Sequence, residues 1–266
     1  MPKQVKVEVL SHTPLGADYL ELTVRAREIP PGVPGQFAAL RVGRGLDPLL
    51  RRPLSIHHQD PRRGTLQFLY KVVGRGTRLL SGYGKGEEID LIAPLGRGFS
   101  LEGLGPHTPA LLVAGGVGAA PLYFLAVRLK ERGIPVTFLL GGRSIEDLAF
   151  RDKLSRLLGE RLVISTEDGS LGRQGLVTGL IKDLPPAGEE GGYHLFACGP
   201  EPMLKETARL AREVSPHPLQ FSLEAVMACG FGACLGCVCP ASGKGKTPYL
   251  RVCTEGPVFH DGEVEL

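Results

Sequence analysis

Four cysteines toward the C-terminal end constrain this chain more than any other feature of its sequence. They are Cys229, Cys234, Cys237 and Cys253. The first three have the spacing C-x4-C-x2-C, which is typical of a plant-type [2Fe–2S] centre. Glycines at 230, 232 and 236 allow a short loop to wrap closely around an inorganic core, and they leave backbone N–H groups free to point at the sulfurs. The pattern therefore predicts a redox centre, which needs an electron donor and an electron acceptor.

Two other interpretations of the cysteines stay open at this point. Four cysteines also hold structural zinc, but zinc sites usually contain paired C-x2-4-C knuckles, and this chain has only one short pair. A disulfide or a set of buried thiols is the third interpretation. Six cysteines without a targeting segment favour a reducing compartment, and hence metal ligation over disulfides.

Composition excludes several classes of function. The chain has 266 residues, of which 42% are apolar and 22% charged, as in an ordinary globular protein of one to three domains. The net charge of +3 is too small to argue for a nucleic-acid partner. No apolar run reaches the length of a membrane span, and the first ten residues alternate like a strand rather than forming a signal-peptide block. We expect a cytoplasmic protein that binds neither nucleic acid nor membranes.

The first hundred residues contain short alternating segments separated by proline and glycine turns. Six strands are predicted, over residues 5–9, 20–24, 36–42, 54–57, 65–73 and 88–92. Short strands at this spacing without a long helix are typical of an antiparallel barrel or sandwich.

Two segments of this region have the chemistry of an anion site. In the first, Arg52 follows Arg51 and precedes Pro53, Leu54 and Ser55. A guanidinium at the start of a strand suits a bidentate grip on a diphosphate, although paired arginines are more often solvated surface. In the second, Gly74-Arg-Gly76 is followed by Thr77, which can cap a short helix and form a small anion nest. A plain glycine-rich turn explains that segment equally well.

After residue 106 the pattern changes to alternating strands and helices. Residues 110–114 form a continuous apolar run, as in a parallel strand covered on both faces. A glycine turn with Gly115, Gly116 and Gly118 follows and leads into a helix over 122–132, an arrangement that presents helix N–H groups to a phosphate. Further strands are predicted over 136–140, 162–165 and 194–197, and further helices over 147–158, 176–181 and 200–214. Cys198, Gly199 and Pro200 end the last strand.

These motifs together resemble the ferredoxin-NADP reductase superfamily. The barrel resemblance rests on Arg52-Pro53-Leu54-Ser55, on Leu69-Tyr70-Lys71 and on Gly76-Thr77. It implies that the arginine holds an FAD diphosphate, that Ser55 lies beside the flavin ring, and that the Gly-Thr turn adds a phosphate contact. The glycine turn at 115–118 and the Cys198-Gly199-Pro200 segment resemble the nucleotide domain of that superfamily. The first then faces a dinucleotide diphosphate, and the second lies where nicotinamide meets flavin.

The loop after the predicted strand at 162–165 bears on the choice between NAD and NADP. It reads Thr166-Glu167-Asp168-Gly169, where superfamily members that prefer NADP commonly have serine and arginine. Carboxylates repel a 2′-phosphate and accept hydrogen bonds from a free ribose hydroxyl, so the loop favours NAD. Arg143 and Arg173 are near in sequence and weaken this prediction.

Over its whole length the chain resembles the electron-transfer subunits of type 1B dihydroorotate dehydrogenases. The resemblance is sharpest around Cys229–Cys237 and in Arg251-Val-Cys253 with the following Gly-Pro. It implies an α+β multidomain chain: an N-terminal antiparallel β-barrel for FAD (1–101), an α/β parallel-sheet NAD-binding domain (102–218) and a small C-terminal [2Fe–2S] domain (219–266). The cluster ligands become Cys229, Cys234, Cys237 and Cys253, whereas Cys239 departs from the family pattern and is expected to be a buried thiol.

The resemblance also implies a partner. Dihydroorotate would be oxidised on a separate FMN-containing catalytic subunit, two copies of each subunit forming a heterotetramer, and electrons would pass through [2Fe–2S] and FAD to NAD+. No residue of this chain is expected to act as a catalytic acid or base, His57 and His58 included. Leu235 and Gly236, between two ligands, are expected near the surface of the partner.

Three alternatives remain at this point. One is an FAD/[2Fe–2S] subunit of a ferredoxin- or hydrogenase-linked NAD(P)H oxidoreductase. The others are a self-contained reductase that feeds an oxygenase, and a zinc-stabilised regulatory module on a disused flavin fold. Cys229 favours the dihydroorotate system, because some ferredoxin- or hydrogenase-linked relatives have a carboxylate at the first ligand position.

Overall fold

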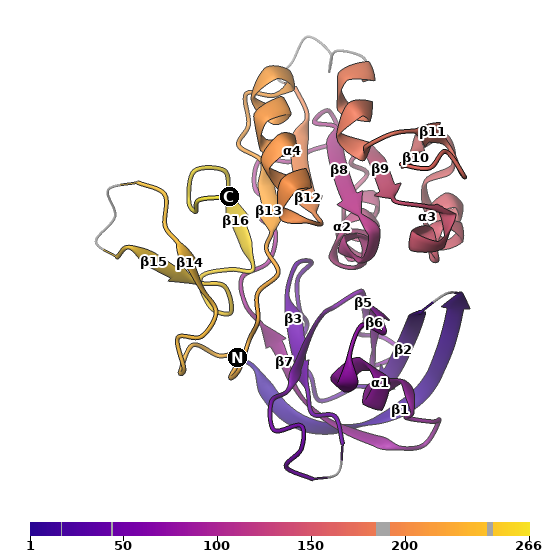
Figure 1. Ribbon diagram of the computed structural model, residues 1–266, viewed down its shortest axis with the longest axis vertical. Coiled ribbons are helices and arrows are strands. Elements are labelled where there is room, and N and C mark those ends of the chain that lie inside the picture. Colours follow the sequence, from indigo (N-terminus) through magenta and orange to yellow (C-terminus); the bar gives the residue numbers. More distant parts are fainter. Residues whose placement is uncertain (17, 44, 185–191, 244–246) are drawn as a thin grey trace.

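The chain folds into two stacked layers of structure with a smaller C-terminal segment at their side. The computed structural model describes residues 1–16, 18–43, 45–184, 192–243 and 247–266. In Figure 1 a curved antiparallel sheet lies below an α/β unit, and the C-terminal segment flanks both. Within the described ranges, every helix is too short or too polar to cross a membrane.

The lower unit is a seven-stranded antiparallel sheet rolled into a barrel. Its strands are β1 (Lys3–Gly16), β2 (Tyr19–Arg25), β3 (Phe37–Leu40), β4 (Arg52–Ser55), β5 (His58–Asp60), β6 (Thr65–Lys71) and β7 (Glu88–Leu95), and the helix α1 (Arg75–Ser81) joins the last two. The strand order is β4-β3-β7-β1-β2-β6-β5, so two strands that are neighbours in sequence lie at opposite edges. Between them, the N–H of Ile56 donates to the carbonyl of Gln36 (2.9 Å) and that of His57 to Gln67 (2.9 Å), which joins the two edges.

This closure corrects one detail of the predicted barrel. A single strand was expected over 54–57, but the chain pairs with β3 as far as Ser55 and with β6 from His58 onward. The two residues between cannot belong to both ladders, so the barrel has seven strands rather than six. Its interior is apolar, with Phe68, Leu22 and Ile56 among the fully buried side chains.

The upper unit is a second seven-stranded sheet, mostly parallel. Its strands are β8 (Ala110–Gly115), β9 (Val136–Gly142), β10 (Leu162–Thr166), β11 (Arg173–Gln174), β12 (His194–Cys198), β13 (Gln220–Ser222) and β16 (Val258–His260), in the order β11-β10-β9-β8-β12-β13-β16. Its helices are η1 (Gly116–Gly118), α2 (Ala119–Glu131), η2 (Ile145–Leu148), α3 (Arg151–Leu158), η3 (Gly159–Arg161), η4 (Val177–Asp183) and α4 (Glu201–Val214).

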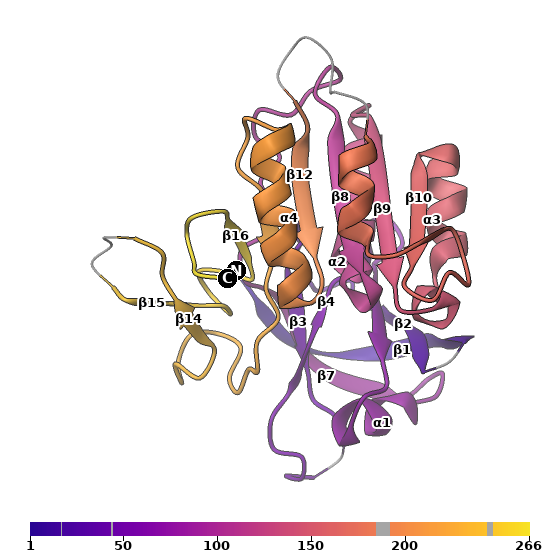
Figure 2. The same ribbon diagram turned by 45° about the horizontal axis from the view of Figure 1, so that its top comes forward.

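Both faces of the upper sheet are covered, which explains its continuous apolar strands. Leu111 and Val113 of β8 pack in the same cluster as residues of α4 and η4, whereas Ala110, Leu112 and Ala114 pack with α2 and α3. Figure 2 shows α4 and η4 on one side of the strands and α2 on the other. Since alternate side chains of a strand point to opposite faces, a strand that is buried on both sides has apolar residues at successive positions.

Two predicted helices differ in form from the structure. The helix expected over 147–158 is divided into η2 and α3. Ser144, whose hydroxyl accepts from the N–H of Glu146 at 3.3 Å, begins the first of them before the predicted start. The helix expected over 176–181 is the 3₁₀ helix η4.

The C-terminal segment begins and ends as part of the upper sheet. β13 pairs in parallel with β12, and β16 pairs antiparallel with β13. Phe221 lies opposite Phe259 in that pair, and both side chains are fully buried. Between them the chain forms a small two-stranded sheet of β14 (Val238–Pro240) and β15 (Tyr249–Arg251). The predicted NAD-binding domain stops at residue 218, but its sheet gains two more strands beyond that residue, β13 and β16.

Polar contacts fix the barrel against the upper unit. Lys71 of β6 donates to Oδ1 of Asp147 at 2.9 Å, and Lys153 of α3 pairs with Glu21 of β2. His57 is fully buried at this junction, and its ring contacts the carbonyl of Ala120 through Nδ1 at 3.0 Å. Burial lowers the pKa of His57 to about 3. His57 is therefore a packed, neutral part of the junction.

We expect the folded chain to lose stability as the pH falls below about 6.5. The unfolded state binds a proton at His57 near that pH, whereas the folded state resists protonation down to a pKa of about 3. One such group makes the free energy of unfolding fall by up to about 1.4 kcal/mol per pH unit. Denaturant unfolding between pH 8 and 5 measures the slope. In His57→Gln the slope is expected to be smaller by about this amount, and an unchanged slope would contradict the assignment.

Candidate functional site

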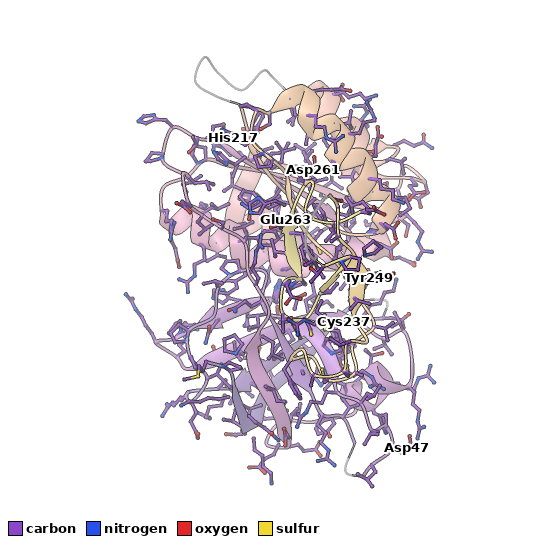
Figure 3. The ribbon with its side chains drawn as sticks, turned by 90° about the vertical axis from the view of Figure 1, so that its left-hand side faces the viewer. Asp47, His217, Cys237, Tyr249, Asp261 and Glu263 are labelled. Carbon is purple, nitrogen blue, oxygen red and sulfur yellow. The ribbon has the colours of Figure 1, made fainter. Side chains whose placement is uncertain are left out.

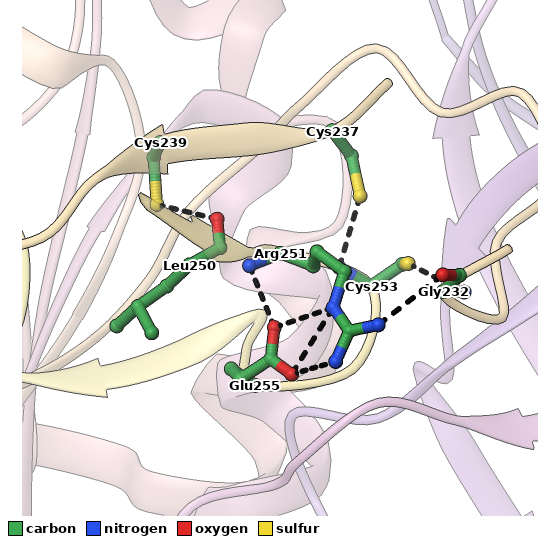
Figure 4. Close-up of polar contacts among 7 residues, drawn as sticks. All are labelled: Gly232, Cys237, Cys239, Leu250, Arg251, Cys253 and Glu255. Carbon is green, nitrogen blue, oxygen red and sulfur yellow. Dashed lines mark hydrogen bonds and ion pairs between the residues drawn. The ribbon is translucent and has the colours of Figure 1, made fainter. Parts of the chain in front are cut away.

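The four predicted cluster ligands converge from two segments of the C-terminal region. Cys229 and Cys234 lie in the loop before β14, Cys237 directly precedes β14, and Cys253 is the second residue after β15. Backbone N–H groups donate to their sulfurs: Gly232 to Cys253 (3.1 Å), Cys234 to Cys229 (3.4 Å), Gly236 to Cys234 (3.4 Å) and Cys253 to Cys237 (3.4 Å). Figure 4 shows the contacts around Cys237 and Cys253.

Exposure divides the cysteines into an inner and an outer pair. Cys237 and Cys253 are buried, Cys229 is half-buried and Cys234 is exposed. Residues 233–236 are all exposed, and Leu235 has a positive φ of 56°, a conformation that non-glycine residues seldom adopt. The sulfur set therefore has one side in the protein and one side at the surface. Figure 3 shows Cys237 and Tyr249 near each other in the C-terminal segment.

The loop favours thiolates at its outer side. Burial raises the pKa of Cys229, but hydrogen bonds from the N–H groups of Phe231 and Cys234 outweigh it and hold this pKa at about 6. Burial and the neighbouring Cys237 raise the pKa of Cys253. Since metal and cluster ligation needs deprotonated sulfur, N–H groups aimed at the sulfurs suit an anionic iron–sulfur group. Among the described residues, no group of three or more His, Cys, Asp or Glu side chains is arranged so that it could hold a single metal ion.

Cys239 is turned away from this set. Its thiol donates to the carbonyl of Leu250 at 3.5 Å, across the β14–β15 pair, and it is half-buried (Figure 4). Burial raises its pKa. The half-buried thiol at this position is consistent with a packing role.

A cavity of about 310 Å³ opens between the barrel and the upper unit. The predicted residues Pro53, Leu54, Ser55, Leu69, Tyr70, Lys71, Thr77 and Cys198 line it. So does a stretch that the sequence analysis did not single out: Ser222, Leu223, Glu224, Ala225 and Met227. The chain leading into the cysteine loop thus forms one wall of the cavity.

The structure brings Arg52 and Gly76 together beside this cavity. A Cβ atom at residue 76 would overlap the Arg52 guanidinium, so glycine is needed for the arginine to lie over the first turn of α1. Arg51 is used differently: its Nη1 is 2.7 Å from Oδ1 of Asp90. In the described part of the chain, Arg52 forms no ion pair with a carboxylate, and its Nη1 donates to the carbonyl of Leu50 at 2.6 Å. Of the arginine pair, Arg52 is the one available to an anion.

Thr77 caps the start of α1 from the third helical position. Its hydroxyl accepts from the N–H groups of Val73 (3.0 Å) and of Gly74 (3.2 Å), the residue at which the helix begins. Its hydroxyl therefore shapes the turn. The Lys71 ammonium likewise donates to Asp147. The polar groups of Thr77 and Lys71 are thus used within the protein, although both residues line the cavity.

A second and larger cavity, of about 630 Å³, lies at the carboxyl ends of the parallel strands. The predicted Gly115, Gly116, Gly118, Gly199 and Pro200 line it. A Cβ atom on Gly118 would overlap the carbonyl of Cys198, and one on Gly115 would lie 2.9 Å from the sulfur of Met203. Glycine lets two strand ends approach each other, and it exposes backbone at the N-terminus of the following helix, where an anionic diphosphate is favoured.

Val117 and Glu224 line both cavities, which places the two side by side. Burial raises the pKa of Glu224, whose side chain solvent reaches through the cavities. Cys198, next to this junction, is buried, and burial raises the pKa of its thiol. Spacing did not single out either residue, because Val117 is the variable position of the glycine turn and Glu224 precedes the cysteine pattern. The position of Glu224 near Cys198 depends on the parallel pairing of β12 with β13.

The carboxylate loop after β10 is divided between two tasks. Glu167 lines the larger cavity, whereas the Asp168 carboxylate accepts from the N–H and hydroxyl of Ser170 (2.9 and 2.6 Å). Arg173 pairs with Asp183 and does not line that cavity. Arg143 does line it, but its Nε lies 3.1 Å from Oδ2 of Asp147.

The cysteine loop also adjoins the smaller cavity. Gly230 has a φ of 80°, and a Cβ atom there would lie 3.7 Å from the ring of Phe37 and 3.8 Å from Leu95. Phe37 itself lines the smaller cavity. The three sites therefore follow one another: cysteine loop, smaller cavity, larger cavity.

Comparison with known proteins agrees with this arrangement. Residues 224–265 match the family described as the iron-sulfur cluster binding domain of dihydroorotate dehydrogenase B, and residues 112–209 match the oxidoreductase NAD-binding domain. The chain is 42% identical over 233 residues to the dihydroorotate dehydrogenase B (NAD(+)) electron transfer subunit of Geobacillus kaustophilus, covering 88% of this chain and 87% of that one. The chain belongs to the family of dihydroorotate dehydrogenase B electron transfer subunits.

Other members and solved structures extend this result. The electron transfer subunit of Lysinibacillus sphaericus is 35% identical over the full length of both chains. The structure of an NADH-dependent reduced ferredoxin-NADP oxidoreductase is 30% identical with a TM-score of 0.82, covering 97% of this chain and 89% of that one. A ferredoxin NADP+ reductase from Neisseria gonorrhoeae, solved with FAD and NADP, shares the fold at 19% identity and a TM-score of 0.64, over 80% of this chain and 92% of that one. The predicted family and fold class are confirmed.

The contact between Arg52 and Gly76 yields a test of the smaller cavity in this family member. We expect Gly76→Ala to weaken FAD binding by about tenfold or more, about 1.4 kcal/mol, because the new Cβ displaces the guanidinium. Gly74→Ala is the matched control: residue 74 has an extended φ of −165°, and a Cβ there meets nothing within 4 Å. FAD content after gel filtration and titration of stripped protein measure the effect. Equal losses in both variants would contradict the role given to Arg52.

Proposed function

We propose that this chain carries electrons from a separate dihydroorotate-oxidising subunit to NAD+, as the name of its relatives describes. The observation that supports this most is the order of its three sites. The cysteine loop reaches the surface at Cys234, adjoins Phe37 of the smaller cavity at Gly230, and that cavity adjoins the larger one at Val117 and Glu224. A chain built only to bind a nucleotide has no need of such a series.

Cys229, Cys234, Cys237 and Cys253 would hold a [2Fe–2S] cluster. Four thiols with N–H groups directed at their sulfurs fit an anionic cluster, because those hydrogen bonds stabilise negative charge on sulfur. Cys239, which is turned toward Leu250, is left out of the ligand set.

The smaller cavity would hold FAD. Arg52 would bind the diphosphate over the first turn of α1, where Gly76 gives it space, and Ser55 would lie at the ring edge. The other residues of the wall are Pro53, Leu54, Leu69, Tyr70, Lys71 and Thr77. When bound, FAD accepts electrons singly and releases them in pairs as a hydride. The chain supplies position and exclusion of water, because its apolar walls surround the junction of the two cavities.

NAD+ would enter the larger cavity as the co-substrate. Gly115, Gly116 and Gly118 present backbone to its diphosphate at the start of α2. Cys198, Gly199 and Pro200 would line the nicotinamide end, next to Val117 and Glu224. In the balanced reaction, dihydroorotate and NAD+ give orotate, NADH and a proton.

A catalytic partner follows from the same proposal. We infer an FMN-containing dihydroorotate dehydrogenase subunit, with two copies of each chain in a heterotetramer. Exposed apolar side chains around the outer cysteines support a docking surface there: Val226 (88% exposed), Leu235 (60%), Tyr249 (57%), Phe231 (54%) and Val238 (45%). Six free thiols suit the reducing cytoplasm, where we place the complex.

We keep the division into an FAD-binding barrel (1–101), an NAD-binding domain (102–218) and a cluster domain (219–266) as a proposal. β13 and β16 join the cluster domain to the NAD-binding sheet. The third unit is therefore a long excursion from one edge of that sheet.

A second function has one observation in its favour. The likeness to the NADH-dependent reduced ferredoxin-NADP oxidoreductase covers almost the whole chain, cysteine region included. An FAD/[2Fe–2S] subunit of a ferredoxin-linked NAD(P)H oxidoreductase would use the same series of sites. In that case the partner exchanges electrons with ferredoxin and does not oxidise dihydroorotate.

The purified chain should first show the absorbance of both groups, with about two irons and two acid-labile sulfides per FAD. A colourless protein with one zinc would contradict the cluster. Mixed with the catalytic subunit of the same cell, it should reduce NAD+ with dihydroorotate, and neither chain should do so alone. If reduced ferredoxin supports this reaction and dihydroorotate with that subunit does not, the second function is correct.

The docking surface is tested by separating two activities. We expect Leu235→Glu to slow dihydroorotate-dependent NAD+ reduction about tenfold, since a charge in the centre of an apolar interface costs about 1–2 kcal/mol or more. NADH-to-dye activity, which uses only the larger and smaller cavities, should be unchanged. Val163→Glu, at an exposed position of β10, adds the same charge away from the cysteines as a control. If both activities fall together in Leu235→Glu, the order of the sites is wrong.

The preference for NAD is tested at the carboxylate loop. We expect the ratio of kcat/KM for NAD+ to that for NADP+ to be well above one and to fall about tenfold in Glu167→Gln, because a carboxylate facing the larger cavity repels a 2′-phosphate. Asp168→Asn is the matched control, since Asp168 is occupied by Ser170. Equal use of both nucleotides by the unaltered chain would overturn the preference.

A further inference from the structure

One side chain reaches across the cysteine loop from the far segment. Nη1 of Arg251, the last residue of β15, donates to the carbonyl of Gly232 at 3.2 Å. The N–H of the same glycine donates to Sγ of Cys253 at 3.1 Å, the shortest of the four N–H to sulfur contacts given above. Figure 4 shows Arg251, Gly232 and Cys253 as one connected group. Both peptide groups that flank the Gly232 Cα are thus tied to the 251–253 segment.

Glu255 fixes Arg251 in this position. Its carboxylate accepts from the backbone N–H of Arg251 at 2.7 Å and from Nε at 3.0 Å, and it also pairs with Nη2. The carbonyl of Arg251 accepts from the backbone N–H of Glu255 at 2.9 Å, so the backbone turns tightly here. Glu255 thus binds the Nε and Nη2 edge of the guanidinium, and Nη1 is left to donate to the Gly232 carbonyl.

Gly232 needs an outside anchor. Its φ of 87° lies in the left-handed region, and a Cβ atom there would lie 2.8 Å from Cγ2 of Thr254. Without a side chain, the residue has no rotamer or packing contact to hold its peptide groups, and glycine is the most mobile of residues in a loop. The neighbouring residues 233–236 are exposed and give it no cover.

We propose that Arg251, held by Glu255, is a positioning residue that aims the Gly232 N–H at Cys253 and thereby sets the reduction potential of the [2Fe–2S] centre. This inference rests on the proposed cluster. A hydrogen bond to a ligand sulfur stabilises the reduced, more negative state of a cluster more than the oxidised state. Arg251 keeps that bond short, so it holds the potential up to a value at which the centre accepts electrons from the partner.

Charge alone would give a different pattern of effects. A guanidinium near the sulfurs also raises the potential by its positive charge, but Glu255 offsets this charge within the same pair. Lysine keeps the charge and lacks the planar fork that binds Glu255 and the Gly232 carbonyl together. Positioning therefore predicts a large effect of Arg251→Lys, whereas charge predicts almost none.

The test is a redox titration of the full chain, with FAD and cluster bound, followed by the electron paramagnetic resonance signal of the reduced cluster. Arg251→Lys should shift the midpoint potential to a more negative value and alter the signal shape. Gly232→Ala, which displaces the same N–H without changing any charge, should shift it in the same direction. Arg209→Lys is the matched control, because Arg209 forms a comparable fork with Glu206 on the exposed side of α4. It should leave potential and signal unchanged.

Iron and sulfide content separate this inference from the cluster proposal. If the unaltered chain holds no iron and shows no signal, the proposed cluster is wrong. If the unaltered chain is loaded, and Arg251→Lys keeps its iron with the same potential or a higher one, only the positioning role is wrong. Should Arg251→Lys lose its iron, Glu255→Gln decides: a negative shift supports positioning, whereas a positive shift, as loss of a negative charge alone would give, overturns it.

Discussion

The antiparallel pairing of β13 with β16 is the contact on which the rest of this structure depends. It places Phe221 opposite Phe259, and both rings are fully buried in the core shared with α4 and η4. Burying a phenylalanine contributes about 1.5–3 kcal/mol, so the pair fixes both ends of the cysteine-bearing segment firmly. Because the segment starts and finishes at one sheet edge, its first residues must pass over the barrel. That path forms a wall of the smaller cavity and brings Gly230 against Phe37.

Missing side chains matter as much as present ones at the three sites. Gly76 gives space to Arg52, Gly118 to the carbonyl of Cys198, and Gly232 takes a left-handed conformation that brings its N–H to a ligand sulfur. In each case a methyl group would separate two groups that act together. Close approach of groups across a glycine is therefore common to the three sites.

The sequence predicts most of the fold and much of the site. Cysteine spacing, the Arg-Pro-Leu-Ser strand and the glycine turn each have a local physical cause, and the structure gathers these residues around two cavities and one loop. Other features depend on tertiary contacts. The split of one predicted strand into β4 and β5 follows from barrel closure, which no local pattern encodes. Glu224 borders both cavities only because β13 lies beside β12, and Arg251 reaches Gly232 only because β15 pairs with β14.

The shared sheet edge links closure of the cysteine loop to the stability of the edge itself. Cluster assembly cross-links the cysteine loop, and its free energy favours only conformations in which the loop is closed. Since β13 and β16 are the two ends of that loop, closing it also shortens the excursion of chain that the sheet edge must restrain. A chain made under iron limitation would open more readily at this edge and expose Phe221 and Phe259 to proteases.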